Sequence, residues 1–219
     1  MRTRAPRDLA TLPFAHRLNP FTGEIERSGT YEWLHFEGRT FDDAEGSSSL
    51  FSESAFSSVT FNRGRFRRSR FDDVWLHTVR MVGTNLAETT WLDSECTASI
   101  FAGAEVHGAE MRRTVFHQCK FDSANLRAAT LKDVTFVDCL LRDVDFSGAT
   151  LNGVCFPGSA LDGARFDKAT LTAVDLREAT TLRIASGTGS LSGATISTTQ
   201  LFDLAPLLAQ HVGFTVKDD

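Results

Sequence analysis

Residues 121–151 read FDSANLRAATLKDVTFVDCLLRDVDFSGATL and carry a large apolar residue at every fifth position. These residues are Phe121, Leu126, Leu131, Phe136, Leu141, Phe146 and Leu151. A helix would scatter every fifth residue over its faces, and a strand would send it alternately to opposite sides of the sheet. The period therefore predicts a short extended segment followed by a corner, repeated along the chain.

The same register extends far beyond this stretch. Taking every fifth residue from Phe36 to Leu201 gives 34 positions, and 31 of them are apolar; the exceptions are Gly46, Thr181 and Ser186. Two residues earlier, 31 of 34 positions from Leu34 to Thr199 are small. Such an internal repeat outranks local secondary-structure signals. The count does not slip anywhere, which predicts one continuous solenoid.

A physical model follows from the pairing of a large and a small residue. Both point inward, the large one filling the centre and the small one letting the backbone pack closely at the wall. Four such sides close a coil of 20 residues, and coils stack at strand spacing, roughly 4.8 Å. About eight coils then make a rod on the order of 40 Å long, close to one turn of B-DNA. The fold class predicted is all-β.

The repeats also resemble a known family. Ala124-Asn125-Leu126, Ala149-Thr150-Leu151, Val144-Asp145-Phe146 and Ala164-Arg165-Phe166 are similar to the A(D/N)LXX motif of pentapeptide repeat proteins. The resemblance covers residues 34–201 and implies a right-handed quadrilateral β-helix. It also implies a kinship with the members that bind type II topoisomerases.

Three regions are expected. Residues 1–33 are predicted to cap the first coil through Phe14, Phe21 and Trp33, with the first dozen residues partly flexible. Residues 34–201 form the β-helix, in which Gly46 leaves one central position empty and lets its coil bulge or open. The stretch from Thr181 to Gly189 lacks two central residues and is expected to fray.

Residues 202–219 are predicted to form a C-terminal helical cap and tail. Leu201, Leu204, Leu207, Leu208, His211 and Val212 form a helical stripe that Thr198 or Thr199 caps, Pro206 divides near Ala205, and Gly213 stops before Phe214-Thr215-Val216. One interpretation is a lid over the last coil, whose plug and strand edges need covering. The resemblance implies a second, a homodimer interface that contains Leu201, Leu204, Leu207, Leu208, Val212 and Phe214.

Composition fits a folded soluble protein, with 42% hydrophobic and 23% charged residues and a net charge of −5. No stretch approaches 18 apolar residues and the N-terminus has no apolar signal region, so we expect no membrane contact and a cytoplasmic location. Residues 81–219 hold 11 basic and 17 acidic residues, a charge of −6. This end is the acidic one.

Reactive side chains show no catalytic arrangement. The six histidines are scattered, and His77 and His117 lie two coils apart, roughly 10 Å, too far for one metal; surface histidines are the expectation. Cys119 and Cys139 lie one coil apart and are expected to pack in the interior as thiols. We predict no catalytic, cofactor or metal site and no enzyme.

The outward positions offer a different chemistry. Reading one column at intervals of 20 residues gives Glu53, Asp73, Asp93, Arg113 and Asp133. An even stripe of carboxylates on a DNA-sized rod can imitate a phosphate backbone. With the family resemblance, this favours a DNA mimic that binds DNA gyrase or topoisomerase IV and protects it from fluoroquinolones or peptide antibiotics. Arg70, Arg112 and Lys132 lie in adjacent columns and dilute the stripe.

Two alternatives stay open. The charges can serve solubility alone on a structural or scaffolding module that binds another protein. Direct nucleic-acid binding is a third and weaker interpretation, based on the cluster Arg63, Arg65, Arg67, Arg68 and Arg70. A solvated patch is the expectation for that cluster, because Trp75 is the sole aromatic candidate nearby.

Overall fold

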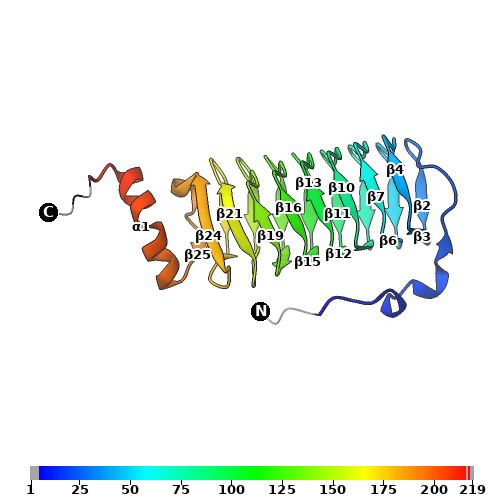
Figure 1. Cartoon of the computed structure of the whole chain (residues 1–219), viewed down its shortest axis with the longest axis horizontal. Coiled ribbons are helices and arrows are strands. Elements are labelled where there is room, and N and C mark those ends of the chain that lie inside the picture. The colour runs from blue at the N-terminus through cyan, green and yellow to red at the C-terminus, as the bar shows by residue number, and fades with distance from the viewer. Residues whose placement is uncertain (1–4, 216, 218–219) are drawn as a thin grey trace.

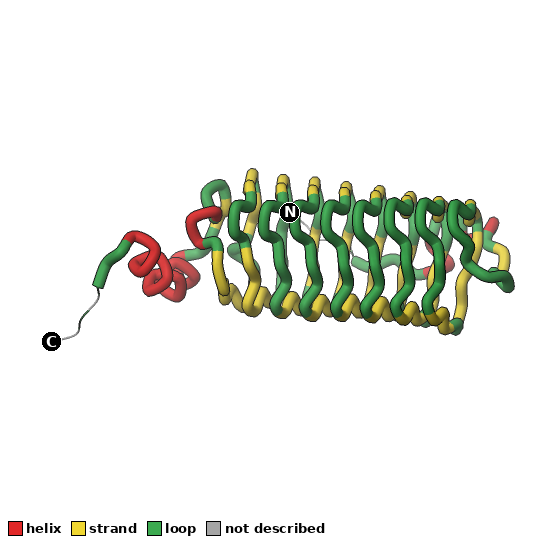
Figure 2. The backbone as a smooth tube through the Cα atoms, turned by 90° about the horizontal axis from the view of Figure 1, so that it is seen from above, coloured by secondary structure: helices red, strands yellow, loops and turns green. Residues whose placement is uncertain are grey.

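The computed structural model describes residues 5–215 and 217 and has the form of a rod with a helix at one end (Figure 1). Every strand pair in the rod is parallel, and coils stack along its axis (Figure 2). The predicted fold is confirmed: a four-sided β-helix of about eight coils with a single C-terminal helix.

Three faces of the rod are strand ladders. The first face contains β2 (Thr30–Glu32), β5 (Leu50–Ser52), β8 (Arg70–Asp72), β11 (Thr90–Leu92), β14 (Glu110–Arg112), β17 (Thr130–Lys132), β20 (Thr150–Asn152) and β22 (Thr170–Thr172). The second contains β1 (Asn19–Pro20), β3 (Leu34–Glu37), β6 (Ala55–Ser57), β9 (Trp75–His77), β12 (Glu95–Thr97), β15 (Val115–His117) and β18 (Thr135–Val137), continued by β23 (Val174–Asp175) and β25 (Ala194–Thr195).

The third face contains β4 (Thr40–Asp42), β7 (Thr60–Asn62), β10 (Arg80–Val82), β13 (Ile100–Ala102), β16 (Lys120–Asp122), β19 (Leu140–Arg142), β21 (Ala160–Arg165) and β24 (Thr181–Ser186). The fourth face is held by single bridges at intervals of 20 residues, from Glu45 with Arg65 to Asp145 with Arg165. Turns follow each bridge, and they give the fourth face its looped outline in Figure 2.

The interior is a set of stacked side chains. All seven large residues of the opening stretch, Phe121 to Leu151, are buried. Phe136 lies between Phe116 and Phe156 with ring centroids 5.0 and 5.1 Å apart. Small inward residues tie coils together: Ser159 donates its hydroxyl to the Phe136 carbonyl and accepts the amide hydrogen of Cys139, both at 2.8 Å. The large-and-small pairing thus produces both the dry axis and the close walls.

The coil at Gly46 is neither open nor bulged, so that expectation is wrong. Gly46 is buried and keeps its bond from its own amide to the Arg65 carbonyl at 2.8 Å. A β-carbon placed on it would lie 2.6 Å from the Phe66 ring and 2.9 Å from Ile25. Ile25, which comes from outside the repeat, fills the space that a large residue at position 46 would take.

The coil near the C-terminal end contains one extra residue, so the register does slip there. Leu161 pairs with Leu182, 21 residues on, whereas Val174 pairs with Ala194 at the usual 20. The irregularity brings Leu182 and Ile184 into the interior in place of Thr181 and Ser186. The stretch expected to fray instead contains a six-residue strand, β24. The β-bulge shifts the register so that the apolar side chains near Thr181 and Ser186 point inward.

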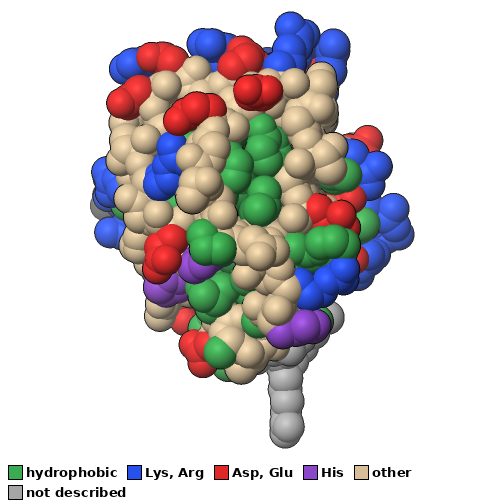
Figure 3. All heavy atoms as spheres, turned by 90° about the vertical axis from the view of Figure 1, so that its right-hand side faces the viewer, with side chains coloured by type: hydrophobic (Ala, Val, Ile, Leu, Met, Phe, Trp, Pro, Cys, Tyr) green, Lys and Arg blue, Asp and Glu red, His purple; other side chains and the backbone are tan. Residues whose placement is uncertain are grey.

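The N-terminal region caps the first coil only in part. Phe21 packs on Phe36 with ring centroids 4.2 Å apart, at the end of the rod where Figure 3 shows hydrophobic side chains amid a charged rim. Residues 7–18, the N-terminal strap, instead lie along the second face and include two short 3-10 helices, η1 (Leu9–Thr11) and η2 (Ala15–Arg17). Leu12 and Phe14 are buried there with Ala55 and Trp75.

The strap is fixed at its far end by a buried ion pair. Glu95 accepts the backbone amide hydrogen of Arg7 and its Nε hydrogen, both at 2.7 Å, and the Trp75 indole donates to the Arg7 carbonyl at 3.1 Å. The exposed fraction of the two charged side chains is 18% for Arg7 and 7% for Glu95. Trp75 is thus buried and serves the fold.

After η3 (Thr188–Ser190), α1 spans Thr198–Val212 and covers the last coil. Its N-cap is Ser197, in a capping box with Gln200, and not Thr198 or Thr199. Pro206 lies inside the helix and does not divide it, while Gly213 ends it in the left-handed conformation as expected. Gln200 and Leu204 are buried against the coil, and the Gln200 amide donates to the Leu176 carbonyl at 2.7 Å.

Candidate functional site

The predicted acidic column lies at one corner of the rod, between the first and second faces. The column residues each directly follow a strand of the first face and have a positive φ, 44° to 55°; they are Glu53, Asp73, Asp93, Arg113 and Asp133. The tight corner requires this left-handed conformation, which Asp tolerates better than most residues. Because every coil turns the same way, the side chains leave the corner in register at strand spacing, roughly 4.8 Å.

The carboxylate of Asp73 lies within electrostatic reach of its neighbours in the column. Burial and the neighbouring carboxylates of Asp93 and Glu53 raise its pKa. Asp93 differs, because Arg113 donates two hydrogen bonds to it at 2.6 and 2.7 Å and lowers its pKa. The column is thus a row of coupled charges in which one carboxylate is neutralised by the next coil.

Glu53 is neutralised by the N-terminal region. It accepts a hydrogen bond from the Trp33 indole at 2.5 Å and lies 3.6 Å from the Arg17 guanidinium. Among the described residues, no ion pair is found for Asp73 or Asp133. The structure brings all four predicted carboxylates to one corner, and among the described residues Asp73 and Asp133 are the two without an ion-pair partner.

The arginine cluster is not a free basic patch. Arg63 pairs with Asp43 at 3.0 Å, Arg65 with Glu45 at 2.6 Å, and Arg70 with Asp72 at 2.7 Å. Arg67 and Arg68 both bind Glu88, at 2.5 and 2.7 Å, and their hydrogen bonds lower its pKa to about 2. Each arginine faces a carboxylate, so the cluster offers little net charge to nucleic acid.

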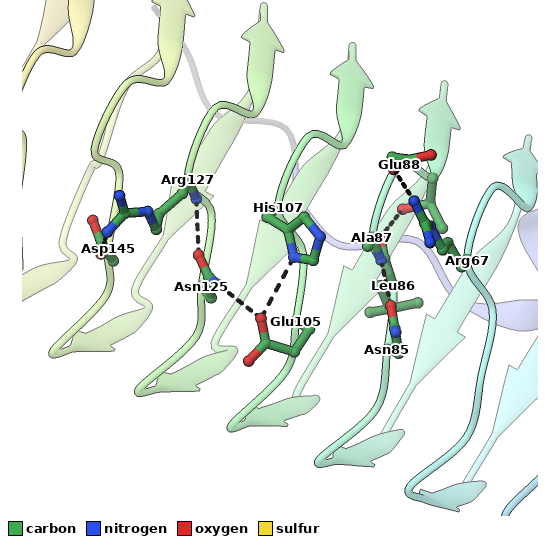
Figure 4. Close-up of polar contacts among 11 residues, drawn as sticks. Arg67, Asn85, Leu86, Ala87, Glu88, Glu105, His107, Asn125, Arg127 and Asp145 are labelled. Atoms are coloured by element: carbon green, nitrogen blue, oxygen red, sulfur yellow. Dashed lines mark hydrogen bonds and ion pairs between the residues drawn. The ribbon is translucent and has the colours of Figure 1, made fainter.

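The fourth face continues this pattern of mixed polar ladders (Figure 4). Asn125 donates to Glu105 at 2.7 Å, His107 lies 3.5 Å from Glu105, and Arg127 lies 3.4 Å from Asp145. The contacts of Asn125 and Arg127 join consecutive coils, whereas His107 contacts Glu105 within one coil. Such ladders suit a solvated wall of a β-helix.

Helix α1 exposes part of the predicted dimer surface. The exposed fractions are 47% for Leu201, 64% for Val212 and 68% for Phe214, whereas Leu204 is buried and Leu207 and Leu208 are half-buried. Phe202 is also exposed, at 72%, and sequence reasoning missed it because it lies off the helical stripe. Val216 lies outside the described residues.

The thiols Cys96, Cys119 and Cys139 are buried packing groups, and His16, His77, His107 and His211 are exposed as expected. Burial raises the pKa of Cys96 and Cys119, and the Cys119 amide donates to the Cys139 sulfur at 3.4 Å. His117 differs from the expectation of surface histidines, because it is buried, and burial lowers its pKa. No cluster of three or more metal-binding side chains occurs within the described part of the chain.

Family models agree with this architecture. The pentapeptide repeat region model matches residues 109–185, and the model of eight pentapeptide repeat copies matches residues 80–118. The chain belongs to the pentapeptide repeat family. No curated protein matches the chain in sequence.

Two solved structures are similar. A trypsin-treated variant of QnrB1, a plasmid-mediated fluoroquinolone resistance protein, is 20% identical over 88% of this chain and 100% of its own, with a TM-score of 0.52. HetL, involved in heterocyst differentiation regulation in the cyanobacterium Nostoc sp. strain PCC 7120, is 13% identical over 78% of this chain and 92% of its own, with a TM-score of 0.31. In residues 5–215 and 217, no helix is long and apolar enough to cross a membrane.

Proposed function

We propose that the protein is a non-catalytic binding protein of the cytoplasm that imitates DNA and binds a type II topoisomerase, DNA gyrase or topoisomerase IV. The observation that carries this proposal is the corner column Glu53, Asp73, Asp93 and Asp133, with its raised Asp73 pKa. A positive DNA-binding groove would hold such a row, and binding would relieve the repulsion within it.

Dimensions support the proposal. One DNA strand carries a charge about every 3.4 Å of axis, and the column carries one side chain about every 4.8 Å. The fold similarity to QnrB1 supports protection from fluoroquinolones as the outcome. A scaffold without a topoisomerase role is the second candidate, and the neutralisation of Glu53 and Asp93 by Arg17 and Arg113 favours it.

The exposed apolar side chains of α1 and of Phe214 beyond it support a homodimer through the C-terminus. Leu201, Phe202, Val212 and Phe214 would pack on the same side chains of a second copy and double the rod. Light scattering of purified protein tests this. We expect a dimer mass for the natural chain and a monomer mass for the double variant Leu201→Asp with Phe202→Asp.

A gyrase supercoiling assay, with and without a fluoroquinolone, tests the function. We expect a salt-sensitive effect on gyrase that is lost in the double variant Asp73→Lys with Asp93→Lys. The matched control is Asp138→Lys with Asp143→Lys, which makes the same charge change at left-handed corners elsewhere on the rod. An equal loss in both double variants would contradict recognition by this column. If the natural chain has no effect on any type II topoisomerase, the topoisomerase proposal is wrong and the scaffold function is the remaining candidate.

A further inference from the structure

The second face differs from the other three in the second half of the rod. Its outward side chains from β15 through Pro157 carry no Lys, Arg, Asp or Glu. They are the half-buried Val115, Thr135, Val137, Cys155 and Pro157 and the buried His117. In the same coils the other faces bear charges, such as Lys132 on the first, Arg142 on the third and Arg127 on the fourth. A solvated wall needs such charges, and this strip lacks them.

The first half of the same face already binds an extended chain. The strap lies across β6, β9 and β12, where Leu12 and Phe14 are buried on Ala55 and Trp75. At its end, Glu95 binds the main chain and the guanidinium of Arg7 together. This contact shows what the face recognises: apolar side chains on the strands, and a basic side chain on a carboxylate.

The part of the strip from Thr135 to Pro157 is half-buried and offers the same two elements. A pocket of about 250 Å³ opens beside Cys155 and Pro157. The corner column carries longer side chains up to Asp133 but only Gly153 and Ala173 in the following two coils, and this change leaves the space. Asp133, Asp175 and Glu178 line the pocket.

The carboxylates around the strip are mostly free. Arg177 binds Asp175 with distances of 3.0 and 2.7 Å, whereas no ion pair is found among the described residues for Asp133, Asp138 or Glu178. A Lys or Arg of a ligand would meet them as Arg7 meets Glu95. The site therefore complements a basic chain segment and opposes an acidic one.

We propose that the second face between Val115 and Glu178 is a docking site for an extended, basic peptide segment of a partner protein. The segment continues the course of the strap, with apolar side chains on the uncharged strip and a Lys or Arg at the pocket. This site shares Asp133 with the proposed topoisomerase column. It differs from that surface because it does not use Glu53, Asp73 or Asp93.

Fluorescence anisotropy with the full chain tests the proposal. The probe is a fluorescein-labelled nonapeptide of alternating arginine and valine, and its counterpart has glutamate in place of arginine. We expect the arginine peptide to bind at least about tenfold more tightly. Cys155→Arg should weaken its binding by about tenfold, whereas Ala160→Arg, at the half-buried outward position of the adjacent face in the same coil, should leave it unchanged.

Two results would overturn the proposal. If the arginine peptide binds equally to the Cys155→Arg and Ala160→Arg proteins, its binding is a general charge attraction and not docking on this strip. Binding that arises only after residues 1–4 are removed would assign the site to the chain's own N-terminus. The gyrase assay separates this site from the proposed function: Cys155→Arg should keep any effect on gyrase, and Asp73→Lys with Asp93→Lys should keep peptide binding.

Discussion

Replacing Gly46 by leucine would restore the repeat pattern, and we expect it to destabilise the protein. The β-carbon alone would lie 2.6 Å from the Phe66 ring and 2.9 Å from Ile25, both of which are buried. Inserting a side chain into a filled interior costs about 1–3 kcal/mol. For a chain of this size, that lowers the melting temperature by roughly 2–12 °C.

Besides Phe66, the clash involves Ile25, and this residue gives the prediction a second arm. Ile25→Ala alone removes buried methyl groups and costs about 2–5 kcal/mol, toward the lower end because the segment lies at the end of the rod. In the double variant, the leucine at position 46 occupies the space that Ile25 vacates. We expect the combined loss to be smaller than the sum of the single losses by about 1–3 kcal/mol.

Thermal unfolding followed by circular dichroism, with urea unfolding for the free energies, measures all three variants. Gly103→Asn is the control, because Gly103 lies at an exposed corner where a β-carbon meets nothing within 4 Å and asparagine tolerates the positive φ. A Gly46→Leu protein as stable as the natural chain, or strictly additive losses, would refute the claim that Ile25 fills this coil.

Three further predictions concern the core and the charges. Phe136→Ala, in the middle of a three-ring stack, should cost about 3–5 kcal/mol in urea unfolding. The double variant Arg67→Gln with Arg68→Gln should raise the Glu88 pKa from about 2 toward its ordinary value of 4.5, which an NMR titration of the carboxyl group would measure. In the natural chain, the stabilisation of the fold by these two arginines is present above pH 4.5 and is lost as the pH falls toward the folded pKa. Because the folded pKa of Asp73 is raised, its charged form opposes folding at neutral pH, and this cost disappears as the pH falls through the folded pKa. Asp73→Asn should therefore raise the melting temperature at pH 7 by up to about 2 °C and leave it unchanged in acid.

The sequence predicts the solenoid well because its inward positions are decided locally. Whether a residue such as Phe121 faces the axis depends only on its place in its own quintet, and each coil repeats the rule. The one-residue slip near Leu182 broke the rule, although the apolar neighbours Leu182 and Ile184 were visible where Thr181 and Ser186 failed it. A fixed count cannot anticipate a bulge.

Contacts between distant segments account for the other differences. Ile25, from outside the repeat, fills the space of a missing central residue. Leu12 and Phe14 pack in a cluster with Trp75, which lies in the third coil. Neither contact has a periodic signal. The pairing of Arg63 and Arg65 with residues 43 and 45 could have been predicted, because partners 20 residues apart stack on the same wall.

The strap makes the two ends of the rod mechanically unequal. Most coils touch only the coils beside them, so a pulled solenoid gives way one layer at a time. The ion pair between Arg7 and Glu95 joins positions 88 residues apart and ties the strap across the N-terminal coils. These coils should therefore resist unfolding as one unit. Tension applied between the termini should therefore peel the rod from the α1 end, and the last layer to yield should be the one that holds Trp75.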